Sequence, residues 1–300
     1  MTYSIVARDD ATGELGVAVA ACMFAAGSVV PWARAGVGAV ATQALSEASY
    51  GPRCLELLAD GASAEAALAQ VRAADELAAL RQVAVIDADG GVASFTGELC
   101  VDHAGHQVGD SYGVQANMVA SDRVWPAMAE VFEASQGTLA QRMLAALRAA
   151  QREGGDARGQ MSAAMVVVDT DRRDEAWAGA RVTIRVDRHA APLDELAALL
   201  DASAAFGAYN QALDALIAGR PDESLDLIDG ALATLPGEEN FEFLRAGALA
   251  ASGRADEATR TLRALVAAKP SWAAIARSVA AKGMLALPAD LNADALLRNL

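Results

Sequence analysis

Residues 2–21 read TYSIVARDDATGELGVAVAA, and this stretch sets the fold of the first part of the chain. Residues 2–7 are rich in β-forming side chains, DDATGE at 9–14 has the composition of a hairpin turn, and LGVAVAA at 15–21 returns as an apolar strand. The chain is therefore expected to open with a β-hairpin whose first strand begins at Thr2.

Working outward, strands followed by helices occur twice along the chain. Short Val- and Ala-rich strands at 27–43 lead into a helical region at 50–72. A second hairpin at 81–98 and a strand at 112–121 lead into a long amphipathic helical region at 122–151. This order indicates that sheets and helices alternate in blocks.

Two further strands, at 161–169 and 180–187, close this part of the chain. Hairpin-connected strands followed by paired helices indicate antiparallel sheets covered by helices, whereas strict alternation of strand and helix would indicate a parallel sheet. We therefore expect an α+β protein in which residues 1–200 form a four-layer αββα sandwich.

Beyond about Leu193 the strand patterns stop and a helical repeat begins. AGRPDE at 218–223 recurs as SGRADE at 252–257, an offset of 34 residues. This is the period of a tetratricopeptide-like helix–turn–helix, in which glycine makes the tight turn and aspartate favours the start of the next helix. We expect an all-α module over residues 201–300, with two repeats and a terminal helix.

Composition and charge exclude several classes of partner. Of the 300 residues, 54% are hydrophobic, which is enough for two cores, and the formal net charge is −15. No basic tract is present that could hold phosphate groups. We therefore expect neither nucleic acid nor a membrane as a partner, and we expect a small-molecule substrate.

The cysteines and the N-terminus indicate a cytoplasmic protein. Cys22, Cys54 and Cys100 form no CxxC pair and are typical of a reducing compartment. The first ten residues, MTYSIVARDD, lack the apolar core of a signal peptide, and no later stretch is apolar for long enough to span a bilayer.

Thr2 is the first candidate for chemistry. Methionine aminopeptidases remove Met1 when the next residue is small, which leaves a hydroxyl and a free α-amine on one residue. An α-amine titrates near about pH 7.7–8.0, so part of it can act at neutral pH as the general base for that hydroxyl. Ser4 shares the strand face of Thr2 and is a candidate to line the same site.

Side-chain amides lie at or near the ends of two other expected strands. Gln43 ends the strand region at 27–43, and Gln115 and Asn117 share one face of the strand at 112–121. Such amides can donate hydrogen bonds to an oxyanion, or they can satisfy neighbouring backbone groups. The sequence leaves both readings open.

A glycine-rich turn, GGDARGQ at 154–160, presents Asp156 and Arg158 just before the strand that contains Ser162. One reading is a buried Asp–Arg pair that holds the loop. The other is a contact with the substrate or with the α-amine of Thr2.

A further cluster, CVDHAGH at 100–106, places a thiol, a carboxylate and two imidazoles in a glycine-containing loop. Its spacing matches no standard structural zinc pattern, so we expect no metal and no cofactor. His103 or His106 is instead expected to form hydrogen bonds in or beside a cleft.

With these segments in view, residues 1 to about 200 resemble the bacterial and archaeal family catalogued as domain of unknown function 1028. The segments that carry the resemblance are SIVARDDATGELGVAVA, VVPWARAGVGAVATQ, SYGP, RQVAVID, TGELC, AGH, GVQANM and GGDARGQMSAA. The family is grouped with the N-terminal-nucleophile hydrolases. The resemblance therefore implies an αββα sandwich and a nucleophile at the start of the first strand, which maps onto Thr2.

Three hypotheses follow for the function. The leading one is an amidase-type hydrolase of a small amide, carbamoyl or peptide-like substrate, in which Thr2 attacks the carbonyl and donors near Gln43 and Asn117 hold the oxyanion. The second is a metal- or His/Asp-dependent hydrolase around His103, His106 and Asp156. The third is a non-catalytic protein that binds a small molecule or assembles. We also expect a homo-oligomer and a protein partner for the helical module.

Overall fold

The structure, a computed structural model, describes residues 2–173, 175 and 178–282. The chain divides into two compact units, Met1–Leu200 and Asp201–Leu300. We call them the α/β unit and the helical unit and describe each by itself.

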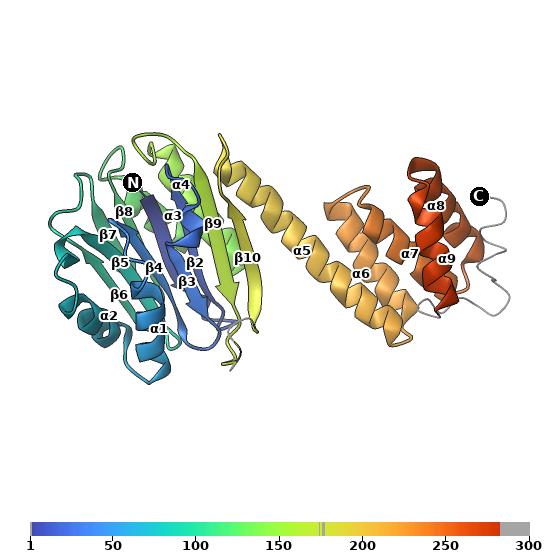
Figure 1. Cartoon of the computed structure of the whole chain (residues 1–300), viewed down its shortest axis with the longest axis horizontal. Helices are drawn as coiled ribbons and strands as arrows, with labels where there is room; N and C mark the ends of the chain where they lie inside the picture. Colours follow the sequence, from blue (N-terminus) through green and yellow to red (C-terminus); the bar gives the residue numbers. More distant parts are fainter. Residues whose placement is uncertain (1, 174, 176–177, 283–300) are drawn as a thin grey trace. The chain divides into compact units, whose positions relative to one another are not determined.

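Two antiparallel sheets form the centre of the α/β unit (Figure 1). The six-stranded sheet has the order β10-β9-β2-β1-β8-β7, and the four-stranded sheet has the order β3-β4-β5-β6. The six-stranded sheet consists of β1 (Thr2–Arg8), β2 (Leu15–Ala21), β7 (Gly105–Gly109), β8 (Tyr112–Asn117), β9 (Ser162–Val168) and β10 (Ala180–Val186). The four-stranded sheet consists of β3 (Pro31–Arg34), β4 (Gly38–Ala44), β5 (Arg81–Asp87) and β6 (Val92–Thr96).

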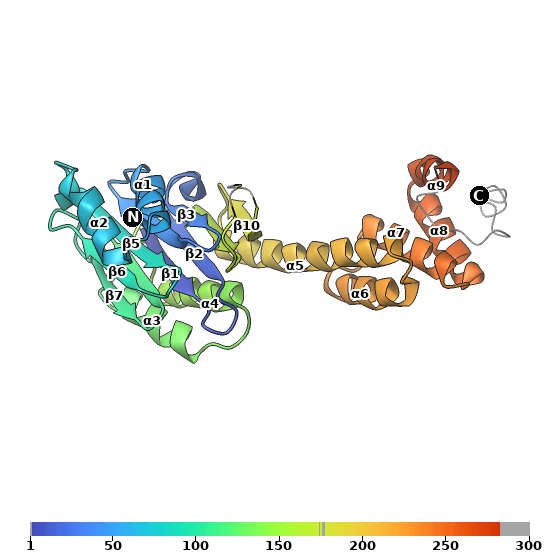
Figure 2. The ribbon, with the colours of Figure 1, turned by 90° about the horizontal axis from the view of Figure 1, so that it is seen from below.

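Helices cover the outer face of each sheet (Figures 1 and 2). The four-stranded sheet carries α1 (Tyr50–Ala59) and α2 (Ala64–Ala73), and the six-stranded sheet carries α3 (Val124–Ala134) and α4 (Leu139–Arg152). Short 3₁₀ turns lie at Ala26–Ser28 and Ala78–Leu80. The layers follow the order α, β, β, α, so the predicted four-layer sandwich is confirmed.

The alternation of β1 determines which side chains face the interior between the sheets. Tyr3, Ile5 and Ala7 belong to the core under α3 and α4, while Val6 belongs to the core between the two sheets. Because side chains alternate along a strand, Thr2 and Ser4 share the face of Val6, toward the four-stranded sheet. A slip of one residue would exchange the two faces, so burial on both sides fixes the register.

Strand β7 is the element that differs from the sequence-based expectation. Residues 100–106 were expected to form one loop, but a strand begins at Gly105, and β8 ends at Asn117 instead of continuing to 121. As an edge strand whose one neighbour in the described part of the sheet is β8, β7 is largely exposed on both faces. Its sequence GHQVG therefore shows no apolar alternation from which a strand could be predicted.

The helical unit repeats one helix–turn–helix pattern. Its helices are α5 (Pro192–Ile217), whose first part belongs to the α/β unit, α6 (Pro221–Thr234), α7 (Glu239–Ala251), α8 (Ala255–Ala268) and α9 (Ser271–Ala281). Gly219 and Gly253 make the turns before α6 and α8 with φ of +74° and +79°, a backbone conformation that favours glycine. The predicted 34-residue repeat therefore corresponds to successive helix pairs.

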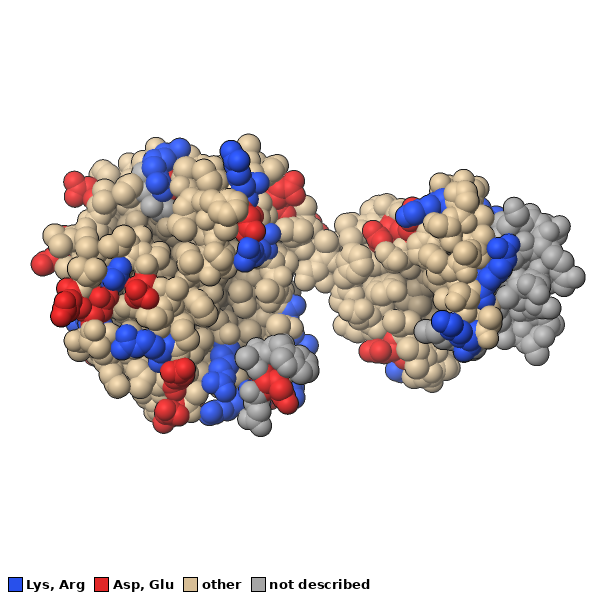
Figure 3. All heavy atoms as spheres, viewed as in Figure 1, with Lys and Arg blue, Asp and Glu red and all other residues tan. Residues whose placement is uncertain are grey.

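Two surface properties bear on partners. None of the helices within the described ranges has the length and apolar character that a bilayer crossing requires. Where described residues form the face shown in Figure 3, acidic and basic side chains are interspersed and do not gather into a broad basic area.

Candidate functional site

Buried polar side chains gather at the end of the sandwich where β1 begins. Strands β4 and β8 end there and β5 begins there, because each runs antiparallel to its neighbours. The buried polar and charged residues at this end are Thr2, Ser4, Thr42, Gln43, Arg81, Gln82, Gln115, Asn117, Asp156 and Ser162. Because unpaired polar groups are costly to bury, their hydrogen bonds show what holds this end together.

Gln43 of β4 joins the two sheets. Its Oε1 accepts a hydrogen bond from Ser4 Oγ at 2.7 Å, and its Nε2 donates to the backbone oxygen of Thr2 at 3.2 Å. The same Nε2 donates to Gln82 Oε1 at 2.7 Å. Both amide hydrogens of Gln43 are therefore used within the protein, which fits the structural reading of this residue and leaves no donor for an oxyanion.

Gln82 of β5 is the centre of this network, and sequence reasoning missed it. Its Oε1 also accepts from Asn117 Nδ2 at 2.9 Å, and its Nε2 lies 2.9 Å from both Thr96 Oγ1 and the backbone oxygen of Ala116. The available signal was its place in RQVAVID, where Gln82 shares a strand face with Ala84 and Ile86, both fully buried. A polar residue on a buried apolar face indicates a hydrogen-bond network.

Gln115 of β8 completes the group around Ser4. Its Nε2 donates to Ser4 Oγ at 3.2 Å and to the backbone oxygen of Ala41 at 3.0 Å. Its Oε1 is buried and has no hydrogen-bond partner in the described part of the chain. Ser4 is thus held between two amide side chains, and because it is fully buried it does not face solvent.

The glycine-rich loop lies against the segments that follow β2 and β8. Asp156 is 3% exposed; its Oδ2 accepts from the Cys22 backbone N–H at 2.8 Å, and its Oδ1 accepts from the Arg158 backbone N–H at 2.9 Å. The Arg158 guanidinium lies 3.4 Å from the same carboxylate. The Asp156 side chain is buried, whereas that of Arg158 is 46% exposed, so the pair lies at the surface with only its carboxylate buried.

Ser162, at the start of β9, has a structural part in this region. Its Oγ donates to the backbone oxygen of Met23 at 2.7 Å and accepts from the Ala26 N–H at 3.2 Å. These bonds fix the turn that follows β2. They account for the burial of Ser162 without a substrate contact.

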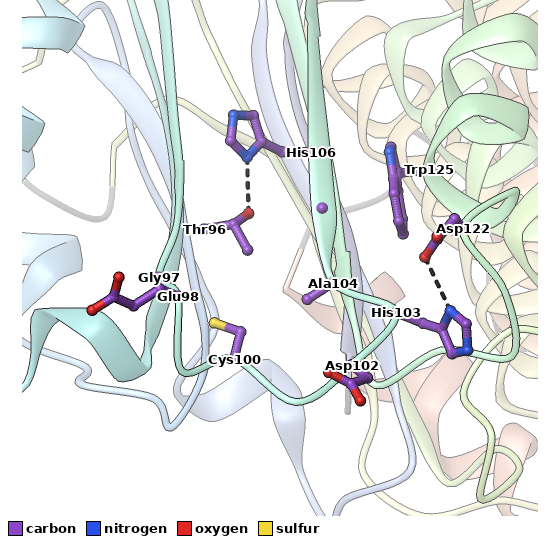
Figure 4. Close-up of a pocket in the computed structure, with 11 residues that line it drawn as sticks. Thr96, Gly97, Glu98, Cys100, Asp102, His103, Ala104, His106, Asp122 and Trp125 are labelled. Carbon is purple, nitrogen blue, oxygen red and sulfur yellow. Dashed lines mark hydrogen bonds and ion pairs between the residues drawn. The ribbon is translucent and has the colours of Figure 1, made fainter.

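A cleft of about 610 Å³ opens at the edge where β6 and β7 meet (Figure 4). It is lined by Thr96, Gly97, Glu98, Cys100, Asp102, His103, Ala104, Gly105, His106, Asp122 and Trp125. Three of these side chains are carboxylates and none is Lys or Arg, so the cleft is acidic. Its volume is in the range of small-molecule sites.

Both histidines of the CVDHAGH cluster line this cleft. His106 Nδ1 lies 2.8 Å from Thr96 Oγ1, and His103 Nδ1 lies 3.0 Å from Asp122 Oδ1 (Figure 4). Partial burial lowers the pKa of the His106 imidazole, and burial raises the pKa of the Cys100 thiol. At neutral pH both groups are therefore neutral.

The structure does not bring the elements of a metal site together. Asp156 does not line the cleft that holds His103 and His106. Within residues 2–173, 175 and 178–282, no group of three or more His, Cys, Asp or Glu side chains could hold a metal ion.

Comparison with known proteins identifies the family of the α/β unit. The model of a family of unknown function, DUF1028, matches residues 2–196, which is more than half of the chain. The chain belongs to family DUF1028. A tetratricopeptide-repeat model matches residues 205–282 of this DUF1028 protein, which confirms the repeat type inferred from the 34-residue period.

Solved structures similar to this DUF1028 chain include a member of the same family. The crystal structure of protein SPO2555 from Silicibacter pomeroyi, described as a member of the same family, is 36% identical with a TM-score of 0.61. The match covers 66% of this chain and 84% of that chain. No curated protein matches the chain.

Within the DUF1028 domain, the residues singled out in the sequence fall into three places. Thr2, Ser4, Gln43, Gln115 and Asn117 come together between the sheets. Asp156, Arg158 and Ser162 lie around the ends of β1, β2 and β9, and His103 and His106 line the cleft. Gln82 and Thr96 connect the first and third groups, because Gln82 contacts the amides between the sheets and Thr96 contacts His106.

Proposed function

We propose that the α/β unit is an amidase-type hydrolase in which Thr2, freed by the removal of Met1, is the nucleophile. The observation that supports this is the position of Thr2. It is the first residue of β1, and it lies on the strand face directed at the polar end between the two sheets. Its backbone oxygen is held by Gln43, while among the described residues no hydrogen bond occupies its hydroxyl.

The chemistry proposed for this arrangement needs no cofactor. The neutral α-amine accepts the hydroxyl proton as Thr2 Oγ1 attacks the carbonyl carbon of a small amide, carbamoyl or peptide-like substrate. The amine then returns the proton to the leaving nitrogen, which leaves an ester on Thr2 that water hydrolyses. Asn117, the register partner of Thr2, uses one of its two amide hydrogens on Gln82, so the other is free to donate to the oxyanion.

Access to Thr2 requires a local opening at this end of the sandwich, since only 3% of its surface is exposed. The acidic cleft is not lined by Thr2. A chain of hydrogen bonds runs from Thr96 in the cleft through Gln82 and Gln43 to the backbone oxygen of Thr2. We propose that the cleft receives part of the substrate.

The experiment compares intact mass and turnover. We expect the purified protein to lack Met1. We expect Thr2→Ala to lose turnover of an amide library by about 10³-fold or more while retaining the circular dichroism spectrum of the native fold, whereas Thr2→Ser keeps measurable activity. Mass spectrometry that finds Met1 fully retained on active protein contradicts the proposal.

For the helical unit we propose a binding function. Tetratricopeptide-type repeats are stacked helix pairs that form concave binding surfaces, and two repeats are fewer than usually make an independent array. We propose that a protein partner or a second copy of the chain covers part of this unit. Analytical ultracentrifugation of the full chain at several concentrations tests the second possibility: a mass of one chain throughout contradicts self-association.

A further inference from the structure

The register of β1 leaves a defined position directly ahead of Thr2. Thr2 pairs with Ala21 of β2 on one side and with Asn117 of β8 on the other. One step further, the ladder would continue between Cys22 and the residues that follow Asn117. These two segments define a slot in the plane of the six-stranded sheet.

Asp156 contacts both segments that flank this slot. Its carboxylate accepts the backbone N–H of Cys22 at 2.8 Å, and Asp156 also forms a β-bridge with Val119. Backbone hydrogen bonds hold the loop to both neighbouring segments. Ala120 N–H donates to the backbone oxygen of Gly155 at 2.9 Å, and Met161 N–H donates to the backbone oxygen of Ala21 at 3.0 Å. The glycine-rich loop is therefore anchored to the segments that follow β2 and β8, on either side of the line of β1.

The position of the slot places the carboxylate close to the nitrogen of Thr2. A strand advances by about 3.3 Å per residue, and the contacts of Asp156 lie one or two residues beyond the partners of Thr2. Asp156 is therefore within roughly 3–7 Å of the Thr2 nitrogen along the strand direction. The negative charge of Asp156 also acts on a side chain of β1. Burial raises the pKa of Tyr3, and the charge of Asp156 raises that pKa further.

Few other charged or titratable groups face this position. From the loop, Arg158 approaches the Asp156 carboxylate at 3.4 Å, and its guanidinium side chain is about half exposed. The Cys22 thiol follows directly after β2, and β1 contributes the hydroxyl of Tyr3, which donates to Gln151 Oε1. The four-stranded sheet contributes the neutral amide of Gln43. Asp156 is thus the buried anion at the start of β1.

We propose that Asp156 binds the α-ammonium group of Thr2 once Met1 has been removed, and thereby sets the pH at which Thr2 becomes a nucleophile. The proposal rests on the proposed function for the identity of the amine, but it concerns binding and not turnover. A carboxylate beside an ammonium group stabilises the charged form, so the amine loses its proton at a higher pH than a free α-amine does. Arg158 acts in the opposite direction.

The test measures the pKa of the amine directly in the full chain. The protein is labelled with ¹³C-threonine, the Thr2 signals are assigned by comparison with Thr2→Ser, and their chemical shifts are followed with pH. We expect Asp156→Asn to lower the pKa of the amine by about one pH unit or more, as the loss of an opposite charge at this range predicts. Arg158→Gln raises it, and this variant keeps the test intact if Asp156→Asn fails to fold.

A matched control is Asp122→Asn, which changes the net charge equally but removes a carboxylate that is 71% exposed and paired with His103. It leaves the pKa of the Thr2 amine unchanged. An unchanged amine pKa in folded Asp156→Asn, or a fall in Arg158→Gln, overturns the proposal even if amide turnover is present. Conversely, shifted pKa values without any turnover uphold the role of Asp156 and contradict the hydrolase. Full retention of Met1 contradicts both.

Discussion

At the scale of single residues, the polar end of the sandwich is built from side-chain amides that satisfy one another across two sheets. Gln82 accepts hydrogen bonds from Gln43 and Asn117, and each of these in turn contacts or pairs with Thr2. All three amides are buried, so each donor depends on the acceptor opposite it. The position of Thr2 is therefore tied to a residue in a different sheet.

We expect Gln82→Leu to destabilise the α/β unit. The change keeps the volume nearly constant but leaves amide hydrogens of Gln43 and Asn117 without an acceptor in a buried site. Each of the two unpaired donors costs about 1–3 kcal/mol, so the free energy of unfolding falls by roughly 2–6 kcal/mol. Urea denaturation of wild type and Gln82→Leu measures this loss in the free energy of unfolding.

The matched control for Gln82→Leu is Gln70→Leu on the exposed side of α2. It makes the same chemical change where water replaces the lost contacts, and its effect stays within about 0.5 kcal/mol. If both variants lost the same free energy of unfolding, the hydrogen bonds of Gln82 would contribute nothing to stability beyond the packing of the side chain.

The sequence predicts this site in part. The period of two along β1 and β8 correctly places Thr2 with Ser4 and Gln115 with Asn117 on common faces. It does not predict that Gln43 and Gln82 lie opposite them, because the pairing of residues across two sheets depends on how the sheets pack. The same holds for Asp156, whose place ahead of Thr2 depends on the register of three strands.

At the scale of elements, an ion pair joins α1 to the segment between α2 and β5. Asp75 Oδ2 accepts from Arg81 Nε at 2.8 Å and from the hydroxyl of Tyr50 at 3.0 Å, and Arg81 also donates to the backbone oxygen of Leu45. The side chains of Asp75 and Arg81 are 14% and 7% exposed. The contacts fix the start of β5, one residue before Gln82.

This ion pair predicts a pH dependence of stability. The hydrogen bond from Arg81 holds the pKa of Asp75 below its usual value. A carboxyl with a lowered pKa stabilises the fold above its unfolded pKa of about 3.9, and this contribution is lost as the pH falls through the folded value. At pH 7 Asp75→Asn lowers the free energy of unfolding by about 3 kcal/mol, because Arg81 loses its partner.

Urea denaturation of wild type and Asp75→Asn between pH 2 and 7 measures this dependence. The difference between the two proteins shrinks as the pH falls below about 4, where the unfolded carboxyl takes up a proton, and it is lost below the lowered folded-state pKa of Asp75. Asp110→Asn, in the exposed turn between β7 and β8, provides a control in which the difference stays small at every pH. A constant gap between wild type and Asp75→Asn down to pH 2 would refute the assignment to Asp75.

Elements were predictable where local chemistry specifies them. The turns DDATGE and DADGG predict both hairpins, because glycine and aspartate supply the backbone conformations that tight turns need. Strand β7 was missed because an exposed edge strand needs no apolar side chains. His106 was consequently placed in a loop, although its position on β7 directs it toward Thr96.

At the scale of the whole molecule, the chain has separate hydrophobic cores in its two units. The α/β unit contains the core under α3 and α4, the core between the sheets and the core under α1 and α2. The helical unit has its own core, in which Phe241 stacks on Tyr209 at 5.3 Å and meets Phe206 edge-on at 4.8 Å. The offset between AGRPDE and SGRADE indicates this division in the sequence. A repeat of 34 residues is typical of stacked helix pairs, and it begins where the strand patterns stop.

Separate cores predict separate unfolding. Phe241 is fully buried, so Phe241→Ala costs the helical unit about 3–5 kcal/mol through the cavity it leaves. Hydrogen exchange followed by mass spectrometry then shows lost protection in α6 and α7, while β1 and β8 exchange as in the wild type. Phe24→Ala, at a side chain that is 67% exposed, serves as the control and changes neither unit. Loss of protection in β1 and β8 would instead mean that the two units unfold together, and a partner bound by the helical unit could then control Thr2 through stability alone.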